Sequence, residues 1–137
     1  MSKKSTWGII GSGWIADVVS SDLKLSGFEI GGVYSRNPET ANKFATKYQV
    51  DHVYSSLADL LANAEIDVVY IATLNHLHKE MAIAALNAGK NVLCEKPLAL
   101  NQKEAAEMVS AAKSQKLFFM EAMWSRFLPM YQDILRI

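Results

Sequence analysis

A glycine-rich segment with the pattern G-x-G-x-x-A is the first part of this chain whose residues could do chemistry. It consists of Gly11, Ser12, Gly13, Trp14, Ile15 and Ala16. Gly11 would allow a tight turn, Gly13 would let the backbone approach a pyrophosphate, and Ala16 would let a helix pack closely on a strand. Glycine also serves turns for structural reasons, so the position directly after an apolar run is what favours dinucleotide binding. We predict that the first five of these residues bind a dinucleotide, with helical N–H groups facing its phosphates.

The second segment follows the next apolar run and contains Ser35 and Arg36 but no carboxylate. NAD-binding units usually place Asp or Glu here to hold the ribose hydroxyls. A hydroxyl followed by a guanidinium suits a 2′-phosphate instead, because Arg offers planar, charge-assisted donors to phosphate oxygens. We therefore predict NADP as the cofactor, with NAD as the alternative. The other interpretation of Arg36 is a solvated loop cation.

The third segment follows a nearly continuous apolar run and contains Thr73, Leu74, Asn75, His76 and His78. Ligands of open α/β sheets bind at the carboxyl ends of the strands, so the first four residues are predicted to line the cofactor. His78 is predicted to be partly structural. The two-residue spacing of the histidines does not place both rings on one helix face, and no Cys or carboxylate cluster accompanies them. We therefore predict no metal site.

The fourth segment places Glu95, Lys96 and Pro97 directly after an apolar run that ends in Cys94. An ammonium at this position could hydrogen-bond a substrate hydroxyl or a ribose, and it could exchange a proton. Pro97 would restrict the turn that presents the pair. The alternative is an exposed turn with an incidental charge pair. Cys94 shows no sign of activation and is predicted to pack as a small apolar residue.

The fifth segment contains Trp124 and Arg126, which could flank a flat ring or a phosphate. We include both residues among the predicted cofactor contacts. Their spacing alone favours the other interpretation, an aromatic core residue beside a surface arginine.

Short apolar runs alternate with segments of helical period along the chain, and these elements must position the five segments. Regular strand–helix alternation predicts the α/β class, with a Rossmann-type doubly wound parallel sheet. Strands are predicted over residues 6–10, 28–35, 53–54, 67–72, 91–94 and 117–120. Helices are predicted over residues 13–25, 57–64 and 76–88. Three further helices are predicted to begin at Pro38, to run from a cap at Asn101 to residue 114, and to follow Pro129. Ser56 is predicted to cap the helix over residues 57–64.

Length and composition limit the classes of protein to consider. The chain has 137 residues, which is room for one domain with a proper core. Its 14 basic and 14 acidic residues leave no global field to attract nucleic acid or an anionic membrane, so neither is an expected partner. One cysteine excludes an internal disulfide, and the N-terminus lacks the apolar stretch of a signal peptide. We expect a cytoplasmic protein.

With these motifs in this order, the chain resembles the Gfo/Idh/MocA oxidoreductase family. The most specific match is Glu95-Lys96-Pro97, which looks like the E-K-P signature of that family. The last matching segment, residues 121–127, is similar to the dihydrodiol dehydrogenase-like branch. Further matches are the glycine-rich segment, Tyr34-Ser35-Arg36, residues 73–78, and Ala84 with residues 86–90. Leu74 stands where the family often has Pro, which is a mild departure.

The resemblance implies an NAD(P)-dependent dehydrogenase that moves a hydride between nicotinamide and a hydroxyl-bearing carbon of a sugar, polyol or diol, and Ser35-Arg36 makes NADP the predicted cofactor. In the family, the lysine of E-K-P lies by the nicotinamide and the substrate and assists proton transfer, so Lys96 is predicted both to contact the cofactor and to be catalytic. The glutamate, here Glu95, is placed near the nicotinamide ribose.

The resemblance also predicts the domain organisation. Family members continue for roughly twice this length into a second α/β domain, which holds most substrate contacts and the dimer interface. That domain is absent from this chain, so residues 1–122 are predicted to be the NAD(P)-binding domain and residues 123–137 the start of the connecting helix. A small-molecule substrate and a homodimer are expected for the full-length enzyme. The chain alone is expected to be truncated, with weak or no activity; the alternative is a non-catalytic NAD(P)-binding regulatory or self-associating module.

Overall fold

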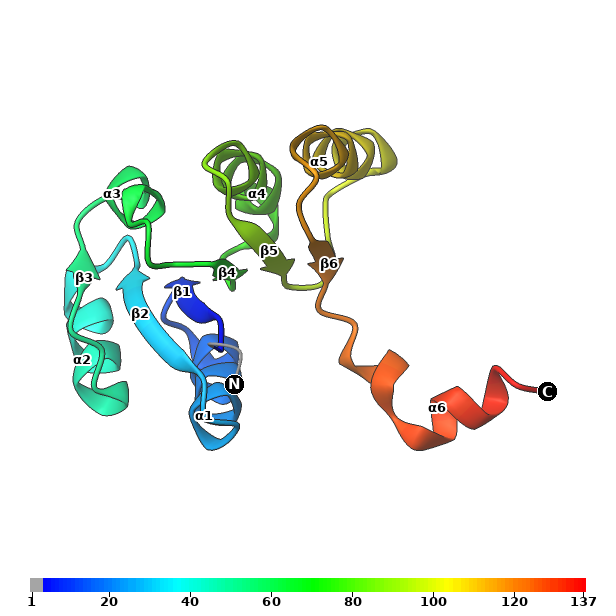
Figure 1. Cartoon of the computed structure of the whole chain (residues 1–137), viewed down its shortest axis with the longest axis horizontal. Helices are drawn as coiled ribbons and strands as arrows, with labels where there is room; N and C mark the ends of the chain where they lie inside the picture. Colours follow the sequence, from blue (N-terminus) through cyan, green and yellow to red (C-terminus); the bar gives the residue numbers. More distant parts are fainter. Residues whose placement is uncertain (1–3) are drawn as a thin grey trace.

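One parallel sheet organises the chain, and a computed structural model describes it for residues 4–137. Residues 1–3 of the predicted first domain lie outside the described residues. The strands are β1 (Thr6–Ile10), β2 (Glu29–Tyr34), β3 (Val53–Tyr54), β4 (Val68–Ile71), β5 (Asn91–Cys94) and β6 (Phe119–Glu121). Their order across the six-stranded sheet is β3-β2-β1-β4-β5-β6, and every pair is parallel (Figure 1). This is the doubly wound order of the Rossmann fold, so the predicted fold class is confirmed.

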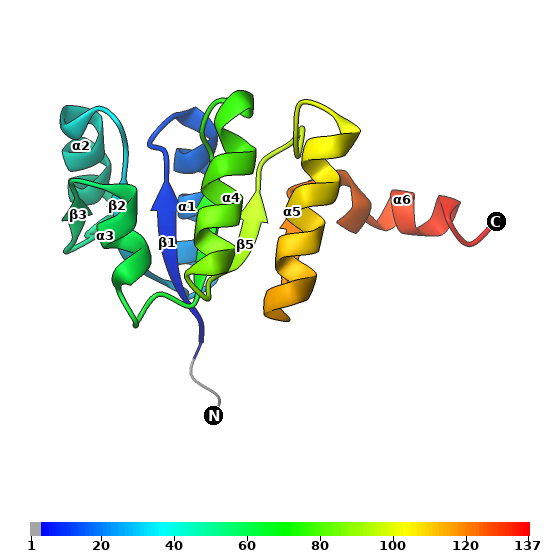
Figure 2. The same cartoon turned by 90° about the horizontal axis from the view of Figure 1, so that it is seen from above.

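Helices cover both faces of the sheet. They are α1 (Trp14–Leu25), α2 (Pro38–Tyr48), α3 (Leu57–Ala62), α4 (His78–Asn87), α5 (Gln102–Gln115) and α6 (Pro129–Ile134), with 3₁₀ turns at Asn75–Leu77 and Trp124–Phe127. Helices α1 and α2 lie on one face, and α3, α4 and α5 lie on the other (Figures 1 and 2). The two faces hold two separate apolar cores.

Strand β4 shows how one short segment serves both cores. Val69 and Ile71 pack with the helices α3, α4 and α5, whereas Tyr70 between them packs with the α1 and α2 core. All three are fully buried. Successive side chains of a strand point to opposite faces, so a strand buried on both faces must be apolar throughout. This is why the nearly continuous apolar run at residues 67–72 predicted a buried strand.

The predicted caps of two helices are confirmed. The Ser56 hydroxyl accepts a hydrogen bond from the Asp59 N–H at 3.1 Å at the start of α3. The Asn101 side chain accepts one from the Glu104 N–H at 3.0 Å at the start of α5. Each side chain satisfies an N–H group that the first helical turn leaves without a backbone partner.

Some predicted boundaries were wrong, and local hydrogen bonds explain the differences. The third helix ends at Ala62 rather than residue 64, because Asn63 accepts a hydrogen bond from the Glu65 N–H and turns the chain. The last strand begins at Phe119 rather than residue 117, because Lys116 is left-handed and the Leu117 N–H bonds back to Ala112 of α5. Residues 75–77 form a 3₁₀ turn, so α4 begins only at His78. The 3₁₀ turn at Trp124–Phe127 was not predicted.

One face of the sheet is only partly covered by helices in the part of the chain that the structure describes. Over β5 and β6, the face on the α1 side carries no helix there, and α6 points away from the sheet (Figures 1 and 2). Met130, Ile134 and Leu135 of this last segment are exposed. No helix among residues 4–137 is both long and apolar enough to span a membrane.

We predict that replacing Leu86 by alanine lowers the free energy of unfolding by about 2–5 kcal/mol, because Leu86 is fully buried between α4 and the sheet. Leu25→Ala is the matched control, since Leu25 is 84% exposed and should change stability by less than about 0.5 kcal/mol. Urea denaturation followed by circular dichroism measures both. Equal effects of the two variants would contradict this description of the core.

Candidate functional site

The segments singled out in the sequence gather at the carboxyl edge of the sheet. The first four follow β1, β2, β4 and β5, and the fifth follows β6. Because all these strands are parallel, the segments meet at the same edge, on both sides of the point where the strand order reverses between β1 and β4.

The glycine turn is built from two glycines with different roles. Gly11 has a φ of +103°, and its N–H donates to the Tyr34 carbonyl oxygen at 2.8 Å. A Cβ at Gly11 would lie 2.5 Å from the Ala72 carbonyl oxygen, so no other residue fits without strain. A Cβ at Gly13 would meet nothing within 4 Å, and no side chain caps the helix that begins after it. Within residues 4–137, no side chain therefore satisfies the N–H groups of the first turn of α1.

A hollow of about 270 Å³ lies on the α4 side of this turn, and we call it the polar hollow because Ser35, Arg36, Asn37 and Thr73 line it together with apolar residues. It brings together Gly11, Ser35, Arg36, Thr73 and Leu74 from the sequence prediction. Tyr34, Asn37, Ala72, Leu77 and Met81 complete its lining. A second hollow of about 430 Å³ shares Tyr34, Ser35 and Arg36 and extends towards Tyr54 and Ser55. Arg36 lies between the two hollows and makes no ion pair within residues 4–137.

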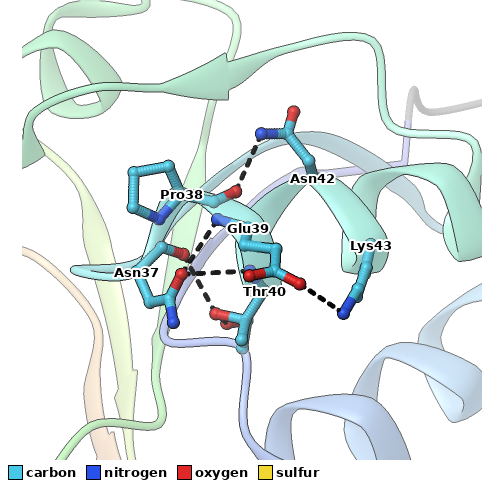
Figure 3. Close-up of polar contacts among 7 residues, drawn as sticks. Asn37, Pro38, Glu39, Thr40, Asn42 and Lys43 are labelled. Atoms are coloured by element: carbon cyan, nitrogen blue, oxygen red, sulfur yellow. Dashed lines mark hydrogen bonds and ion pairs between the residues drawn. The ribbon is translucent and has the colours of Figure 1, made fainter.

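Hydrogen bonds at the start of α2 fix the turn that directly follows Arg36 (Figure 3). The Asn37 side-chain oxygen accepts hydrogen bonds from the N–H groups of Glu39 at 2.9 Å and Thr40 at 3.4 Å. The Thr40 hydroxyl donates to the Asn37 carbonyl oxygen at 3.0 Å and accepts from the Ser12 hydroxyl at 2.8 Å. The glycine turn and α2 are thus joined through two hydroxyls. The sequence analysis missed Asn37 and Thr40, although Asn before Pro is a typical helix start.

An apolar groove of about 510 Å³ lies on the other side of the turn, over the open part of the sheet. Tyr70, Leu93 and Met120 form its floor and are aligned in register across β4, β5 and β6. The groove brings together Trp14, Ile15, Glu95 and Trp124 from the sequence prediction, with Val18, Val19, Asp22, Ala122, Met123 and Phe127. Trp14 is 77% exposed and Trp124 is 69% exposed. Trp124 is therefore not the core residue that its spacing favoured.

Glu95 and Lys96 differ sharply in their surroundings. Glu95 is only 8% exposed, and its two carboxylate oxygens accept from the Tyr70 hydroxyl at 2.6 Å and from the Lys96 N–H at 3.1 Å. The Lys96 side chain is exposed next to it. A buried carboxylate with two donors is not an incidental surface charge, because burial of an unpaired charge is strongly unfavourable.

Two buried groups next to Glu95 keep their protons. Burial, and then the hydrogen bond to Glu95, hold the pKa of the Tyr70 hydroxyl well above its ordinary value. Burial, with a smaller contribution from Glu95, raises the pKa of the Cys94 thiol to about 12. Cys94 is therefore a packed thiol without nucleophilic character, as predicted.

His78 connects the loop that follows β4 with the loop that follows β5. Its Nδ1 lies 2.9 Å from the Pro97 carbonyl oxygen, and its Nε2 lies 3.2 Å from the Thr73 carbonyl oxygen. The ring is fully buried, which confirms its structural role. Asn75, His76 and Arg126 are exposed and line neither the hollows nor the groove described above. Within residues 4–137, no group of three or more His, Cys, Asp or Glu could hold a metal ion.

The model of the GFO_IDH_MocA family, an oxidoreductase family with an NAD-binding Rossmann fold, matches residues 5–123. A scyllo-inositol 2-dehydrogenase (NADP(+)) from Bacillus subtilis is 45% identical over 129 residues, covering 93% of this chain and 39% of the relative. A trans-1,2-dihydrobenzene-1,2-diol dehydrogenase from Mus musculus is 42% identical over 126 residues, covering 90% of this chain and 38% of the relative.

Solved structures agree with these matches. A mutant 3-ketoreductase from Actinomadura kijaniata, in complex with TDP-benzene and NADP, superposes with a TM-score of 0.90 at 27% identity. The match covers 98% of this chain and 42% of that one. This chain thus spans about two fifths of the length of the proteins that it matches.

We predict that Gly11→Ala lowers the free energy of unfolding by about 3 kcal/mol. The added Cβ would clash with the Ala72 carbonyl oxygen, and alanine would have to adopt a positive φ. Gly13→Ala should change it by less than about 1 kcal/mol, since its Cβ meets open space. Thermal and urea unfolding of both variants measure the difference. A Gly11→Ala variant as stable as Gly13→Ala would show that the turn does not require glycine.

Proposed function

This chain belongs to the Gfo/Idh/MocA oxidoreductase family, and we propose that it holds NADP for hydride transfer to or from a hydroxyl-bearing carbon of a sugar, polyol or diol. The observation that carries the proposal is the position of the glycine turn between a polar hollow and an apolar groove. NADP has an adenosine half that carries a 2′-phosphate and a nicotinamide half with a flat ring, and a pyrophosphate joins the two. The polar hollow matches the adenosine half, and the apolar groove matches the nicotinamide half. The uncapped start of α1 matches the pyrophosphate that joins them.

The adenosine half is assigned to the polar hollow. Ser35 and Arg36 would bind the 2′-phosphate, because a guanidinium without another ion pair in the described part of the chain has its donors free. Thr73 and Leu74 would line the adenosine from the opposite wall. Asn75 and His76, in the exposed 3₁₀ turn that follows, are proposed as outer contacts.

The pyrophosphate and nicotinamide are assigned to the glycine turn and the groove. Ser12 and Gly13 would contact the pyrophosphate, and Trp14, Ile15, Glu95 and Trp124 would surround the nicotinamide side. Arg126 is proposed as a further contact from the turn that carries Trp124. The bound cofactor supplies the hydride acceptor or donor.

Lys96 is proposed as the catalytic residue. Its exposed ammonium leaves the sheet edge beside Glu95, where it could hydrogen-bond the reacting hydroxyl and move its proton. The buried Glu95 carboxylate accepts the Lys96 N–H and so restrains the backbone that carries this side chain.

We also propose the domain boundary and the setting of the full enzyme. Residues 1–122 would form the NAD(P)-binding domain and residues 123–137 the start of the connection, supported by the family match that ends at 123 and by α6 leaving the sheet (Figure 2). Hydride transfer, the small-molecule substrate and a homodimer belong to the whole protein.

A cytoplasmic location is proposed because the single cysteine suits a reducing compartment. The exposed apolar residues of the last segment favour self-association as a second candidate role.

We predict that the chain binds NADPH more tightly than NADH, and that Arg36→Ala weakens NADPH binding about tenfold to a hundredfold while leaving NADH binding unchanged. The reason is the loss of charge-assisted hydrogen bonds to the 2′-phosphate. Nicotinamide fluorescence titrations measure all four affinities. Lys43→Ala is the matched control, because Lys43 is an exposed cation on α2 that pairs with Glu39 at 2.7 Å. Equal affinity of the parent chain for both cofactors would contradict the role given to Arg36.

We predict that Lys96→Met lowers turnover about a hundredfold or more, because general acid–base catalysis contributes at least that factor. Turnover is measured as scyllo-inositol oxidation by a chimera that joins residues 1–137 to the part of the Bacillus subtilis relative beyond the match. NADPH affinity should stay within about threefold, since the exposed ammonium is assigned to the substrate. Unchanged turnover would remove Lys96 from the proposed mechanism.

A further inference from the structure

The buried pair Tyr70 and Glu95 couples two neighbouring strands at the edge where they end. Tyr70 belongs to β4 and is fully buried, and Glu95 follows β5. The Tyr70 hydroxyl donates to Glu95 Oε1 at 2.6 Å. Both residues line the apolar groove, so the carboxylate lies in its wall. None of the sequence motifs contains Tyr70, and neither the family resemblance nor the proposed function assigns it a role.

The sheet holds the backbone of Glu95 but leaves the side chain to be oriented by other groups. The Glu95 N–H donates to the Ile71 carbonyl oxygen at 2.9 Å, which continues the pairing of β5 with β4. Three side-chain torsions still separate this backbone from the carboxylate. Two donors hold the carboxylate, the Tyr70 hydroxyl at one oxygen and the Lys96 N–H at the other. Of these two, only the tyrosine hydroxyl reaches the carboxylate from another strand.

The neighbouring titratable groups do not replace this hydrogen bond. The Cys94 thiol is buried and protonated. The Glu121 carboxylate accepts a hydrogen bond from the Leu98 N–H at 2.8 Å. No cation is paired with Glu95 in the part of the chain described. The Tyr70 hydroxyl is therefore the side-chain donor that keeps this carboxylate in one orientation inside an apolar wall.

We propose that Tyr70 is a positioning residue for the nicotinamide half of the cofactor, acting through Glu95. By donating to Oε1, Tyr70 turns the carboxylate so that its remaining acceptor sites face the groove, where a ribose hydroxyl can donate to them. The carboxylate also accepts the Lys96 N–H, so the same contact steadies the segment that carries the catalytic lysine. This inference rests on the proposed function, and it assigns Tyr70 no contact with cofactor or substrate.

The test compares two ligands that share one half. NADPH has both halves, whereas adenosine 2′,5′-bisphosphate has the adenosine and the 2′-phosphate but no nicotinamide. Tyr70→Phe keeps the ring and removes only the hydroxyl. We expect it to weaken NADPH binding about fivefold to tenfold and to leave adenosine 2′,5′-bisphosphate binding within about twofold, because one hydrogen bond to a charged group is lost at one half of the site. Isothermal titration calorimetry on the 137-residue chain measures both affinities.

Tyr48→Phe is the matched control. The Tyr48 hydroxyl is also buried and bonded to a carboxylate, at 2.8 Å from Asp17 Oδ1, but it joins α1 to α2 away from the groove. This variant should leave the ratio of the two affinities unchanged. Glu95→Gln supplies a second check. Combined with Tyr70→Phe, it should weaken NADPH binding by less than the product of the two single losses, because Tyr70 acts only through Glu95.

The possible outcomes separate this inference from the proposed function. If the parent chain binds neither ligand, the proposed function fails and this inference fails with it. If the parent chain binds both, a Tyr70→Phe variant that is unaffected, or that loses both ligands equally, overturns the positioning role alone. Full multiplication of the single losses in the double variant would also overturn it.

Discussion

The parallel pairing of β1 with two neighbours is the constraint on which the site depends. Ile10 is aligned with Tyr34 of β2 and with Ile71 of β4, so the carboxyl ends of these three adjacent strands lie side by side. Gly11 lies at this junction, where its N–H bonds to Tyr34 and the Ala72 carbonyl occupies the space of a side chain. Because the order reverses here, α1 after β1 and α4 after β4 lie on opposite faces of the sheet (Figure 1). The polar hollow lies on the α4 side of the turn and the apolar groove on the α1 side.

Buried polar side chains then hold the loops that the sheet itself does not reach. Leaving such a group unpaired in an apolar interior is costly. His78 lies between the loops after β4 and β5, and Glu95 is held by Tyr70. At the opposite end of the sheet, the buried Lys90 ammonium donates to the carbonyl oxygens of Asn63 at 2.6 Å and Ile66 at 2.8 Å. Burial lowers the Lys90 pKa, which is the expected result for a desolvated cation.

The sequence was most informative where a local requirement allows only a few residue types. Gly11, the caps Ser56 and Asn101, and the doubly buried run of β4 could be recognised because each follows from a short-range rule. Predicted boundaries were wrong where hydrogen bonds of a turn, which apolar periodicity does not encode, set the end of an element. The late start of β6 depends on how α5 ends, and no periodicity in residues 117–120 contains that information. Asn75, His76 and Arg126, which the sequence predicts as cofactor contacts, lie outside the hollows and the groove, and their role stays a prediction.

The sequence by itself determined the alternation of strands and helices, the glycine turn, the absence of a carboxylate after β2 and the presence of Glu95-Lys96-Pro97. These are properties of residues close together in the chain, and apolar periodicity and turn chemistry express them directly. Only the tertiary structure decided that Trp14 and Trp124 line one groove, that Ser12 bonds to Thr40, and that Tyr70 bonds to Glu95. Those pairs are separated by 25 to 110 positions, and their contact depends on strand order and register, which no local pattern encodes.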